Sequence, residues 1–239
     1  MFLLTVKSFR NHLRYGLALA AFAGSCLFPA LSAPAANDQT TKTVLVLGDS
    51  LSAGYGVDPS QAFPALLQEK IEKARLPYRI VNAGVSGDTS AGGVRRLQWL
   101  LRQPVSILLL ELGGNDGLRG LALETTRTNL QQIIDQTRKK YPAVKILIAG
   151  MQMPPNLGVS YVNQFAELFP GLAKTNGAVL IPFLLEDVGG RPNLNQADQI
   201  HPNPEGHSIV ANNVWKVLKP MLQSETAETR PENGATYSK

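Results

Sequence analysis

The stretch Thr43-Val-Leu-Val-Leu-Gly48, followed by Asp49-Ser50-Leu51, decides the fold of this chain. An aliphatic, β-branched run of this length that ends in glycine predicts a strand buried on both faces. Such strands belong to parallel sheets that helices cover on both sides. The serine after the strand is then expected at a strand-to-helix turn, with its hydroxyl open to a crevice.

The rest of the chain alternates between the helical pattern and the strand pattern. Further strands are expected at 79–83, 105–112, 144–149 and 178–181, and helices at 63–75, 91–102, 123–140, 159–175 and 204–222. Alternation of this kind predicts one α/β domain built on a five-stranded parallel sheet that is covered on both faces.

Residues 1–35 have the pattern of a secretory signal peptide. Three basic residues precede an apolar run over 17–31, and Ala33-Pro34-Ala35 supplies small residues for cleavage. The run is shorter than the roughly 20 residues that a membrane-spanning helix needs. We therefore expect cleavage after Ala35 and a periplasmic or secreted protein. Two alternatives stay open, an uncleaved membrane anchor and lipid attachment at Cys26.

Removal of this segment changes the meaning of the composition. The full chain of 239 residues has 23 basic and 18 acidic residues, a formal charge of +5 and one cysteine. Without residues 1–35, which hold three of the basic residues, 204 residues and a charge of about +2 remain. We interpret Arg95-Arg96 and Arg138-Lys139-Lys140 as solvated helix faces and ends, so nucleic-acid binding is not expected. No cysteine is left for a disulfide or a cysteine nucleophile.

Four loops at the carboxyl ends of the predicted strands carry polar residues. They are 48–52, 84–88, 113–116 and, before the last helix, 198–201. Ligands of open parallel sheets bind beyond the carboxyl ends of the strands, so we expect these loops to meet at one site.

The residue types in these loops suit acyl transfer, which needs a nucleophile, a base, a group that orients the base, and oxyanion donors. Ser50 supplies a hydroxyl and His201 a base. Asp198, three residues before His201, can hold one ring nitrogen while the other faces Ser50. The backbone N–H groups of Ser50 and Gly87 and the side-chain amide of Asn115 are candidate oxyanion donors.

Each of these residues alone also has a structural interpretation. A serine after a strand often caps a helix, glycines at strand ends often form turns, and Asp198 can cap a turn. His207, inside the last predicted helix, is interpreted as structural. The occurrence of all four loops at strand ends of one sheet favours the catalytic interpretation.

The four blocks resemble those of the GDSL (SGNH) hydrolases. That family carries Ser, Gly, Asn and His in blocks matched here by Gly48-Asp49-Ser50-Leu51, by Gly87 in Ser86-Gly87-Asp88, by Asn115 in Gly113-Gly114-Asn115-Asp116, and by Asp198-x-x-His201. The resemblance implies a three-layer α/β/α flavodoxin-like fold, no metal and no cofactor. It also implies an oxyanion hole formed by Ser50, Gly87 and Asn115.

The resemblance covers about residues 43–222. We therefore place a hydrolase domain at 36–223, between the signal peptide at 1–35 and a polar tail at 224–239 that is expected to be disordered. Within the family, the chain is similar to a branch of bacterial periplasmic esterases with arylesterase, thioesterase and lysophospholipase activity.

This branch implies a small acyl ester or thioester as substrate. In relatives, the loop after Asn115 and the loop at 151–158 border the acyl groove. An apolar slot is therefore expected from Leu118, Leu121, Met151, Met153 and Leu157. The sequence of 151–158 departs from the branch, so the preference between ester, thioester and lysophospholipid stays open. We also expect transient contact with lipid, and a monomer.

Other enzyme classes match less well. The G-x-S-x-G pattern of ordinary α/β-hydrolases does not occur around Ser50, because Ser52 takes the place of the last glycine. The P-loop and dinucleotide patterns are also missing, and the spacing of His201, Glu205 and His207 does not favour a metal site. Two alternative functions stay open, a carbohydrate O-acetyl esterase with the same residues and a non-catalytic flavodoxin-like binding module.

Overall fold

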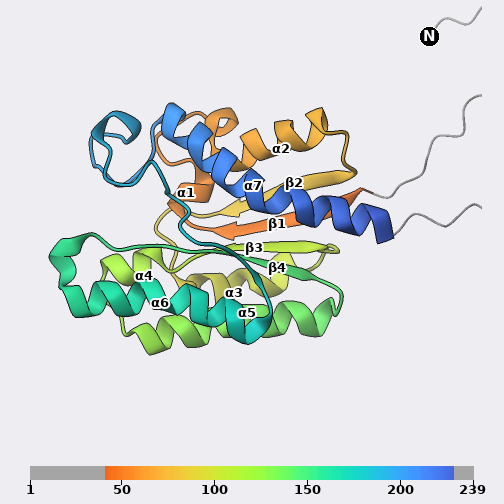
Figure 1. The fold of residues 1–239 in the computed structure, drawn as a ribbon. Coiled ribbons are helices and arrows are strands. Elements are labelled where there is room, and N and C mark those ends of the chain that lie inside the picture. The colour runs from red at the N-terminus through yellow and green to blue at the C-terminus, as the bar shows by residue number, and fades with distance from the viewer. Residues whose placement is uncertain (1–40, 229–239) are drawn as a thin grey trace, which may run out of the picture. The chain divides into compact units, whose positions relative to one another are not determined.

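Five parallel strands form the centre of the structure, a computed structural model that describes residues 41–228 (Figure 1). The strands are β1 Lys42–Gly48, β2 Tyr78–Gly84, β3 Ile107–Glu111, β4 Lys145–Ala149 and β5 Val179–Ile181. Their order in the sheet is β2-β1-β3-β4-β5. The predicted five-stranded parallel sheet is therefore confirmed.

Helices cover both faces of this sheet. The described helices are α1 Ser50–Ala53, α2 Phe63–Lys73, α3 Ser90–Leu100, α4 Gly114–Leu118, α5 Leu123–Lys140, α6 Val159–Asn176 and α7 Pro204–Glu228. Single 3-10 turns occur at Pro59–Gln61, Pro155–Leu157 and Pro192–Leu194. Figure 1 shows α2 and α7 on one side of the sheet and α3, α5 and α6 on the other. The predicted three-layer α/β/α architecture is present.

Alternation along the strands explains why they are apolar throughout. In β1, Val44 and Val46 pack toward α2 and α7, whereas Leu45 and Leu47 pack toward α3, α5 and α6. All four side chains are at most 1% exposed. β3 follows the same alternation, so both central strands contribute to two separate hydrophobic cores.

The predicted elements are all present, with end shifts of up to two residues except at α7. That helix continues to Glu228, although its apolar pattern stops at Leu222. Residues 224–228 were expected in a disordered tail, and this was wrong, because a polar last turn can extend a helix anchored by its apolar part. The remainder of the expected tail, 229–239, and the expected signal peptide lie outside the described residues.

The strand order places the predicted site at a particular edge of the sheet. The chain leaves β1 for β2 on one side and then crosses to β3 on the other, so a crevice forms at the carboxyl end of β1. The register aligns Gly48 of β1 with Gly84 of β2 and Glu111 of β3. The short helices α1 and α4 follow β1 and β3 at this carboxyl edge.

Two helical glycines offer a matched test of the packing on the α3 side. A methyl group added at Gly93 of α3 would lie 2.4 Å from Cδ1 of the buried Leu112, whereas the nearest atom at Gly171 of α6 would be 3.4 Å away. We expect Gly93→Ala to destabilise the fold by about 1–3 kcal/mol through overpacking. Gly171→Ala is expected to be neutral or to stabilise by up to about 1 kcal/mol, because alanine favours the helix.

Urea unfolding of both variants measures these free energies. Equal stabilisation by the two substitutions would contradict the close packing of α3 against Leu112.

Candidate active site

Ser50 is the first residue of α1 and directly follows the carboxyl end of β1. Asp49 caps this helix, since its Oδ1 accepts a hydrogen bond of 3.0 Å from the backbone N–H of Leu51. Ser50 is only 8% exposed. The turn thus holds the serine at the edge of the crevice, as its position after the strand predicts.

Ser50, His201 and Asp198 form a continuous chain of hydrogen bonds, which we call the relay. Nε2 of His201 lies 2.8 Å from Oγ of Ser50, and Nδ1 lies 2.7 Å from Oδ2 of Asp198. The second carboxylate oxygen of Asp198 accepts the backbone N–H groups of Ile200 and His201, each at 3.0 Å. The structure therefore brings together the three residues that the sequence predicts as nucleophile, base and orienting acid.

Asp198 is held in its charged form. Burial raises its pKa, but hydrogen bonds from the backbone N–H and ring of His201 and from the N–H of Ile200 together outweigh burial. The resulting pKa of Asp198 is about 2. An ionised Asp198 keeps a proton on Nδ1 of His201 and leaves Nε2 to accept one from Ser50.

Tyr55 contributes to the histidine environment and was missed in the sequence. Its ring centroid lies 4.7 Å from that of His201, and the two rings are tilted by 44°. Tyr55 is 52% exposed, so it shields one side of the imidazole while it remains at the surface. Only the turn after α1 brings Tyr55 to His201, which explains why spacing alone gives no signal.

The three candidate oxyanion donors belong to separate loops that side chains tie together. Nδ2 of Asn115 donates to Oδ2 of Asp49 at 3.0 Å, which places the amide next to the residue before Ser50. Gly87 has a φ of +78°, a conformation that favours glycine. Nη2 of Arg119, at the end of α4, donates to the carbonyl of Gly87 at 2.9 Å. The loops after β2 and β3 are thus joined across the crevice.

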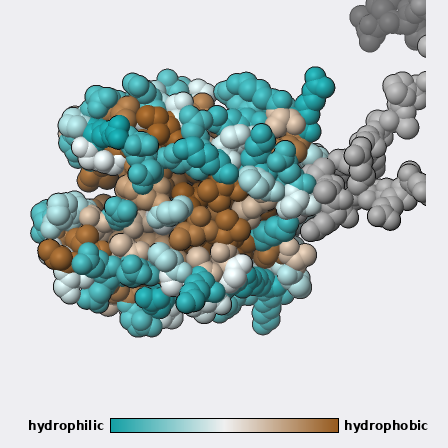
Figure 2. Space-filling model, viewed as in Figure 1, coloured by the Kyte–Doolittle hydropathy of each residue, from teal (hydrophilic) through white to brown (hydrophobic). Residues whose placement is uncertain are grey.

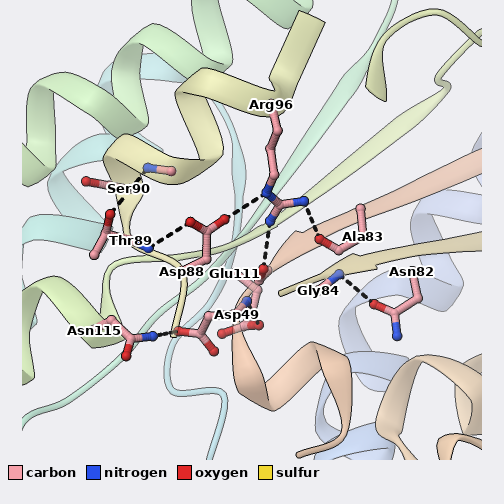
Figure 3. A network of polar contacts seen from close by, with 12 residues as sticks. Asp49, Asn82, Ala83, Gly84, Asp88, Thr89, Ser90, Arg96, Glu111 and Asn115 are labelled. Atoms are coloured by element: carbon pink, nitrogen blue, oxygen red, sulfur yellow. Dashed lines mark hydrogen bonds and ion pairs between the residues drawn. The ribbon is translucent and has the colours of Figure 1, made fainter. Parts of the chain in front are cut away.

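Arg96 of α3 joins the ends of β1 and β2 (Figure 3). Its Nη2 donates to the carbonyl of Gly48 at 2.9 Å and its Nη1 to the carbonyl of Ala83 at 2.5 Å. Its Nε forms an ion pair of 2.7 Å with Asp88, the residue after Gly87. Arg96 therefore holds both strands and the loop of Gly87 in one arrangement.

The interpretation of Arg96 as a solvated helix residue was wrong. Its side chain is only 21% exposed, because α3 packs beside the ends of β1 and β2 and the guanidinium donates to their carbonyl groups. The start of the predicted helix directly after the glycine loop is the sequence signal that could have revealed this.

Asp116 anchors the loop that carries Asn115. It is 1% exposed and accepts hydrogen bonds from the backbone N–H and the hydroxyl of Ser90, at 2.8 and 2.5 Å. Thr126 of α5 also donates to it, at 3.3 Å. These contacts fix α4 against α3 and α5.

The structure divides the five residues of the expected acyl slot into two groups. Met151 and Met153 are 6% and 8% exposed and belong to the core beneath α4. Leu157 is partly buried against the same core. Leu118 and Leu121 are 41% and 40% exposed at the surface beside the site. The methionines therefore support α4 from below instead of forming an open wall.

Exposed apolar side chains gather at this edge of the sheet. Of the eight large apolar residues that are exposed in the described chain, six lie on segments at the carboxyl ends of the strands. They are Tyr55, Val85, Leu118, Leu121, Val159 and Ile200. Figure 2 shows a hollow between the two helical layers at this edge, on the left, with apolar surface around it. Such a concentration is typical of a binding site for apolar groups.

His207 is buried away from the relay. Its Nδ1 accepts the backbone N–H of Phe63 at 3.3 Å, and burial lowers its pKa to about 4. This contact agrees with its interpretation as a structural residue. Within residues 41–228, no group of three or more His, Cys, Asp or Glu side chains is arranged to hold a metal ion.

Comparison with known proteins agrees with this geometry. Residues 46–209 match the GDSL-like lipase/acylhydrolase family. Esterase TesA of Pseudomonas aeruginosa is 43% identical over 182 residues, which cover 76% of this chain and 90% of that protein. Thioesterase 1/protease 1/lysophospholipase L1 of Escherichia coli K12 is 40% identical over 185 residues, or 77% of this chain and 86% of that protein.

Solved structures show the same likeness. The crystal structure of TesA superposes with a TM-score of 0.72 at 43% identity and covers 75% of this chain and 99% of its own. The SGNH-hydrolase esterase AlinE4 superposes with a TM-score of 0.63 at 37% identity and covers 80% of this chain and 97% of its own. The matched residues include the whole Ser50–His201–Asp198 relay, and the chain is a member of the GDSL-like lipase/acylhydrolase family.

Proposed function

We propose that this protein is a serine esterase that hydrolyses carboxylic esters and thioesters of acyl chains through an acyl-enzyme on Ser50. The observation that carries the proposal is the continuous relay from Oγ of Ser50 through the ring of His201 to Asp198. The names of its relatives, which include esterase, arylesterase and thioesterase/lysophospholipase, support the same chemistry.

The first half of the reaction acylates the serine. Nε2 of His201 takes the proton of Ser50 while Oγ attacks the carbonyl carbon of the ester or thioester. The backbone N–H groups of Ser50 and Gly87 and the amide of Asn115 stabilise the oxyanion that forms. His201 then gives its proton to the leaving alcohol or thiol as the carbon–oxygen or carbon–sulfur bond breaks.

The second half regenerates the enzyme. His201 takes a proton from water, which attacks the acyl carbon, and the same donors stabilise the second oxyanion. Collapse of this intermediate releases the carboxylic acid, and His201 returns a proton to Oγ of Ser50. Asp198 remains ionised throughout and stabilises the charged imidazole in both steps.

The surroundings of the relay support an apolar acyl group in the substrate. Leu118 and Leu121 are exposed at the end of α4 and just after it, and Met151, Met153 and Leu157 belong to the core against which α4 packs. A carbohydrate O-acetyl esterase would need few apolar residues here, so the six exposed apolar side chains favour the acyl substrate. We further propose that the enzyme acts as a monomer on small-molecule esters and contacts lipid transiently.

We also propose that the hydrolase domain, at 36–223, is exported by the signal peptide at 1–35 and acts in the periplasm or outside the cell. None of the described helices is both long and apolar enough to cross a membrane. The intact mass of the exported protein distinguishes cleavage after Ala35 from lipid attachment at Cys26.

Substitution of the nucleophile and of one oxyanion donor tests the mechanism directly. We expect Ser50→Ala to abolish hydrolysis of p-nitrophenyl esters and labelling by a fluorophosphonate. Asn115→Ala should still be labelled but lose on the order of 10²–10³ in kcat, the effect of removing one oxyanion donor. Full activity of Ser50→Ala would refute the acyl-enzyme, and a non-catalytic binding module predicts no labelling of the native protein.

Substitution of Arg96, which is not part of the Ser50–His201–Asp198 relay, should still lower kcat. Arg96→Ala removes one hydrogen bond from each of the carbonyls of Gly48 and Ala83 and the ion pair from Asp88. The backbone N–H groups of Val85 and Thr89 still donate to Gly48 and Asp88. A lost hydrogen bond costs about 0.5–1.5 kcal/mol, and one to a charged group about 1.5–3 kcal/mol, so we expect lower stability together with a lower kcat. The neighbouring Arg95→Ala is the control, and equal losses in both variants would contradict a specific role of Arg96.

An acyl-length series tests the apolar substrate. The double variant Leu118→Ser/Leu121→Ser should raise KM for long-chain p-nitrophenyl esters more than for the acetate. Each methylene of the acyl chain that is no longer buried against leucine loses about 0.8 kcal/mol of binding free energy. Exposed Trp99, on the outer part of α3, offers the control substitution Trp99→Ser. A native enzyme that cleaves acetylated sugars but not long acyl esters would favour the carbohydrate esterase.

A further inference from the structure

Two buried carboxyl groups lie beside the nucleophile and take no part in the proton transfer. Glu111, the last residue of β3, is fully buried, and Asp49 is 2% exposed. The register places Glu111 next to Gly48, at the start of the turn that carries Ser50 (Figure 3). The relay of Ser50, His201 and Asp198 does not include either carboxyl group.

Glu111 accepts two hydrogen bonds from the turn that carries Ser50. Its Oε2 accepts the backbone N–H of Asp49 at 3.1 Å and the hydroxyl of Ser52 at 2.5 Å. A methyl group added at Gly48 would lie 2.3 Å from Oε2 of Glu111 and 2.2 Å from Oγ of Ser52. The lack of a side chain at Gly48 is therefore what lets Glu111 reach both residues.

Asp49 connects the turn to Asn115 by a hydrogen bond. One oxygen of its carboxylate accepts the N–H of Leu51, and the other accepts Nδ2 of Asn115, both at 3.0 Å. A side-chain amide nitrogen carries two hydrogens. The hydrogen bond to Asp49 therefore fixes the rotation of the Asn115 amide and leaves its second N–H available to an oxyanion.

The pair can carry only one negative charge at low cost. Burial, and then the charge of Asp49, raise the pKa of Glu111 well above its ordinary value. Burial also raises the pKa of Asp49, to about 6, against the hydrogen bonds from Leu51 and Asn115. Adjacent buried carboxylates repel each other, so one of them keeps its proton. Asp49 has the donors that stabilise an anion, whereas Oε1 of Glu111 has no partner within the described chain.

The charged groups around the pair do not change this conclusion. Arg96 of α3 is committed to Asp88 and two carbonyl groups, His201 to Asp198 and Ser50, and Asp116 of α4 to Ser90 and Thr126. Among residues 41–228, no cation forms an ion pair with Glu111 or Asp49.

We propose that Glu111 is a positioning residue, protonated in the folded enzyme, that acts through Asp49 to orient the amide of Asn115 toward the oxyanion. The proposal rests on the proposed function, which assigns Asn115 to the oxyanion hole. A neutral Glu111 supports the turn without a second negative charge close to the site where the oxyanion develops.

The proton on Glu111 is tested by the pH dependence of thermal unfolding of the wild type and Glu111→Gln. Glutamine has the shape of a neutral glutamic acid and does not ionise. The unfolded chain releases the Glu111 proton near the ordinary pKa of 4.5, whereas the folded protein keeps it to higher pH. Above this pH the wild type therefore binds more protons when folded than when unfolded, and its stability falls as pH rises.

We expect the Tm of E111Q to rise relative to that of the wild type as pH increases from 4 to 8. The control is E124Q, which changes an exposed glutamate of α5 and should not show this trend. A difference between wild type and E111Q that stays constant over this range would show an ionised Glu111 and overturn the proposal.

The link to Asn115 is tested by a double-mutant cycle on kcat. If Glu111 acts through Asn115, E111A lowers kcat with little change in KM and causes little further loss in the N115A background. E111Q should lose less than E111A, under about tenfold, because it keeps an acceptor for Asp49 and Ser52. Losses that multiply in E111A/N115A would show independent action and overturn the proposal.

These experiments distinguish failure of the proposal on Glu111 from failure of the proposed function. If E111A does not fold, D49N replaces it in the cycle with N115A, and multiplied losses again overturn the proposal. If Ser50→Ala retains activity, the proposed function fails, whereas the unfolding series still reports the proton on Glu111 because it needs no substrate.

Discussion

The parallel pairing of β1 with both β2 and β3 is the constraint on which the site depends. This pairing brings three strand ends into one row, with Gly48 between Gly84 and Glu111. Backbone groups just beyond a row of strand ends have no sheet partner and must find one elsewhere. Here side chains supply partners in addition to the backbone N–H of Val85, which donates to the carbonyl of Gly48. Arg96 donates to the carbonyl groups of Gly48 and Ala83, and Glu111 accepts the N–H of Asp49.

The side chains that bind backbone groups at the strand ends also hold the loops of the site in a rigid arrangement. The contacts of Arg96, Asp49 and Asp116 join the loops after β1, β2 and β3 into one network of hydrogen bonds. A site whose donors are held before the substrate arrives stabilises the transition state without reorganisation. This arrangement buries the carboxyl groups of Asp49 and Glu111, and burial raises the pKa of both. We infer that the enzyme keeps these groups buried because they orient the loops.

Most of the fold was predictable because its elements are long and strongly patterned. The five strands and the five long helices show continuous or periodic apolar residues, and nearly all of their ends fall within two residues of the expected positions. The helices α1 and α4 were not predicted, because four and five residues are too few to show a helical period. The helical residues after Leu222 were missed for a related reason, since no large apolar side chain marks them.

The site was predictable only in part. Ser50, Gly87, Asn115, Asp198 and His201 each follow a recognisable pattern next to a strand end or helix start. By contrast, Arg96 and Tyr55 reach the site through the packing of α3 and of the turn after α1. Met151 and Met153 were expected to face the acyl group but lie under α4, because the loop after β4 passes beneath that helix.

The sequence alone thus determined the chemistry of the protein and the architecture that carries it. Residue types and local spacing are enough to predict a serine nucleophile, a histidine with its acid, and a parallel sheet. Only the tertiary structure decided which side chains hold these groups in place and which carboxyl groups are buried beside them. Burial and long-range partners set those properties, and for Glu111 the partners come from residues about sixty positions away in the chain.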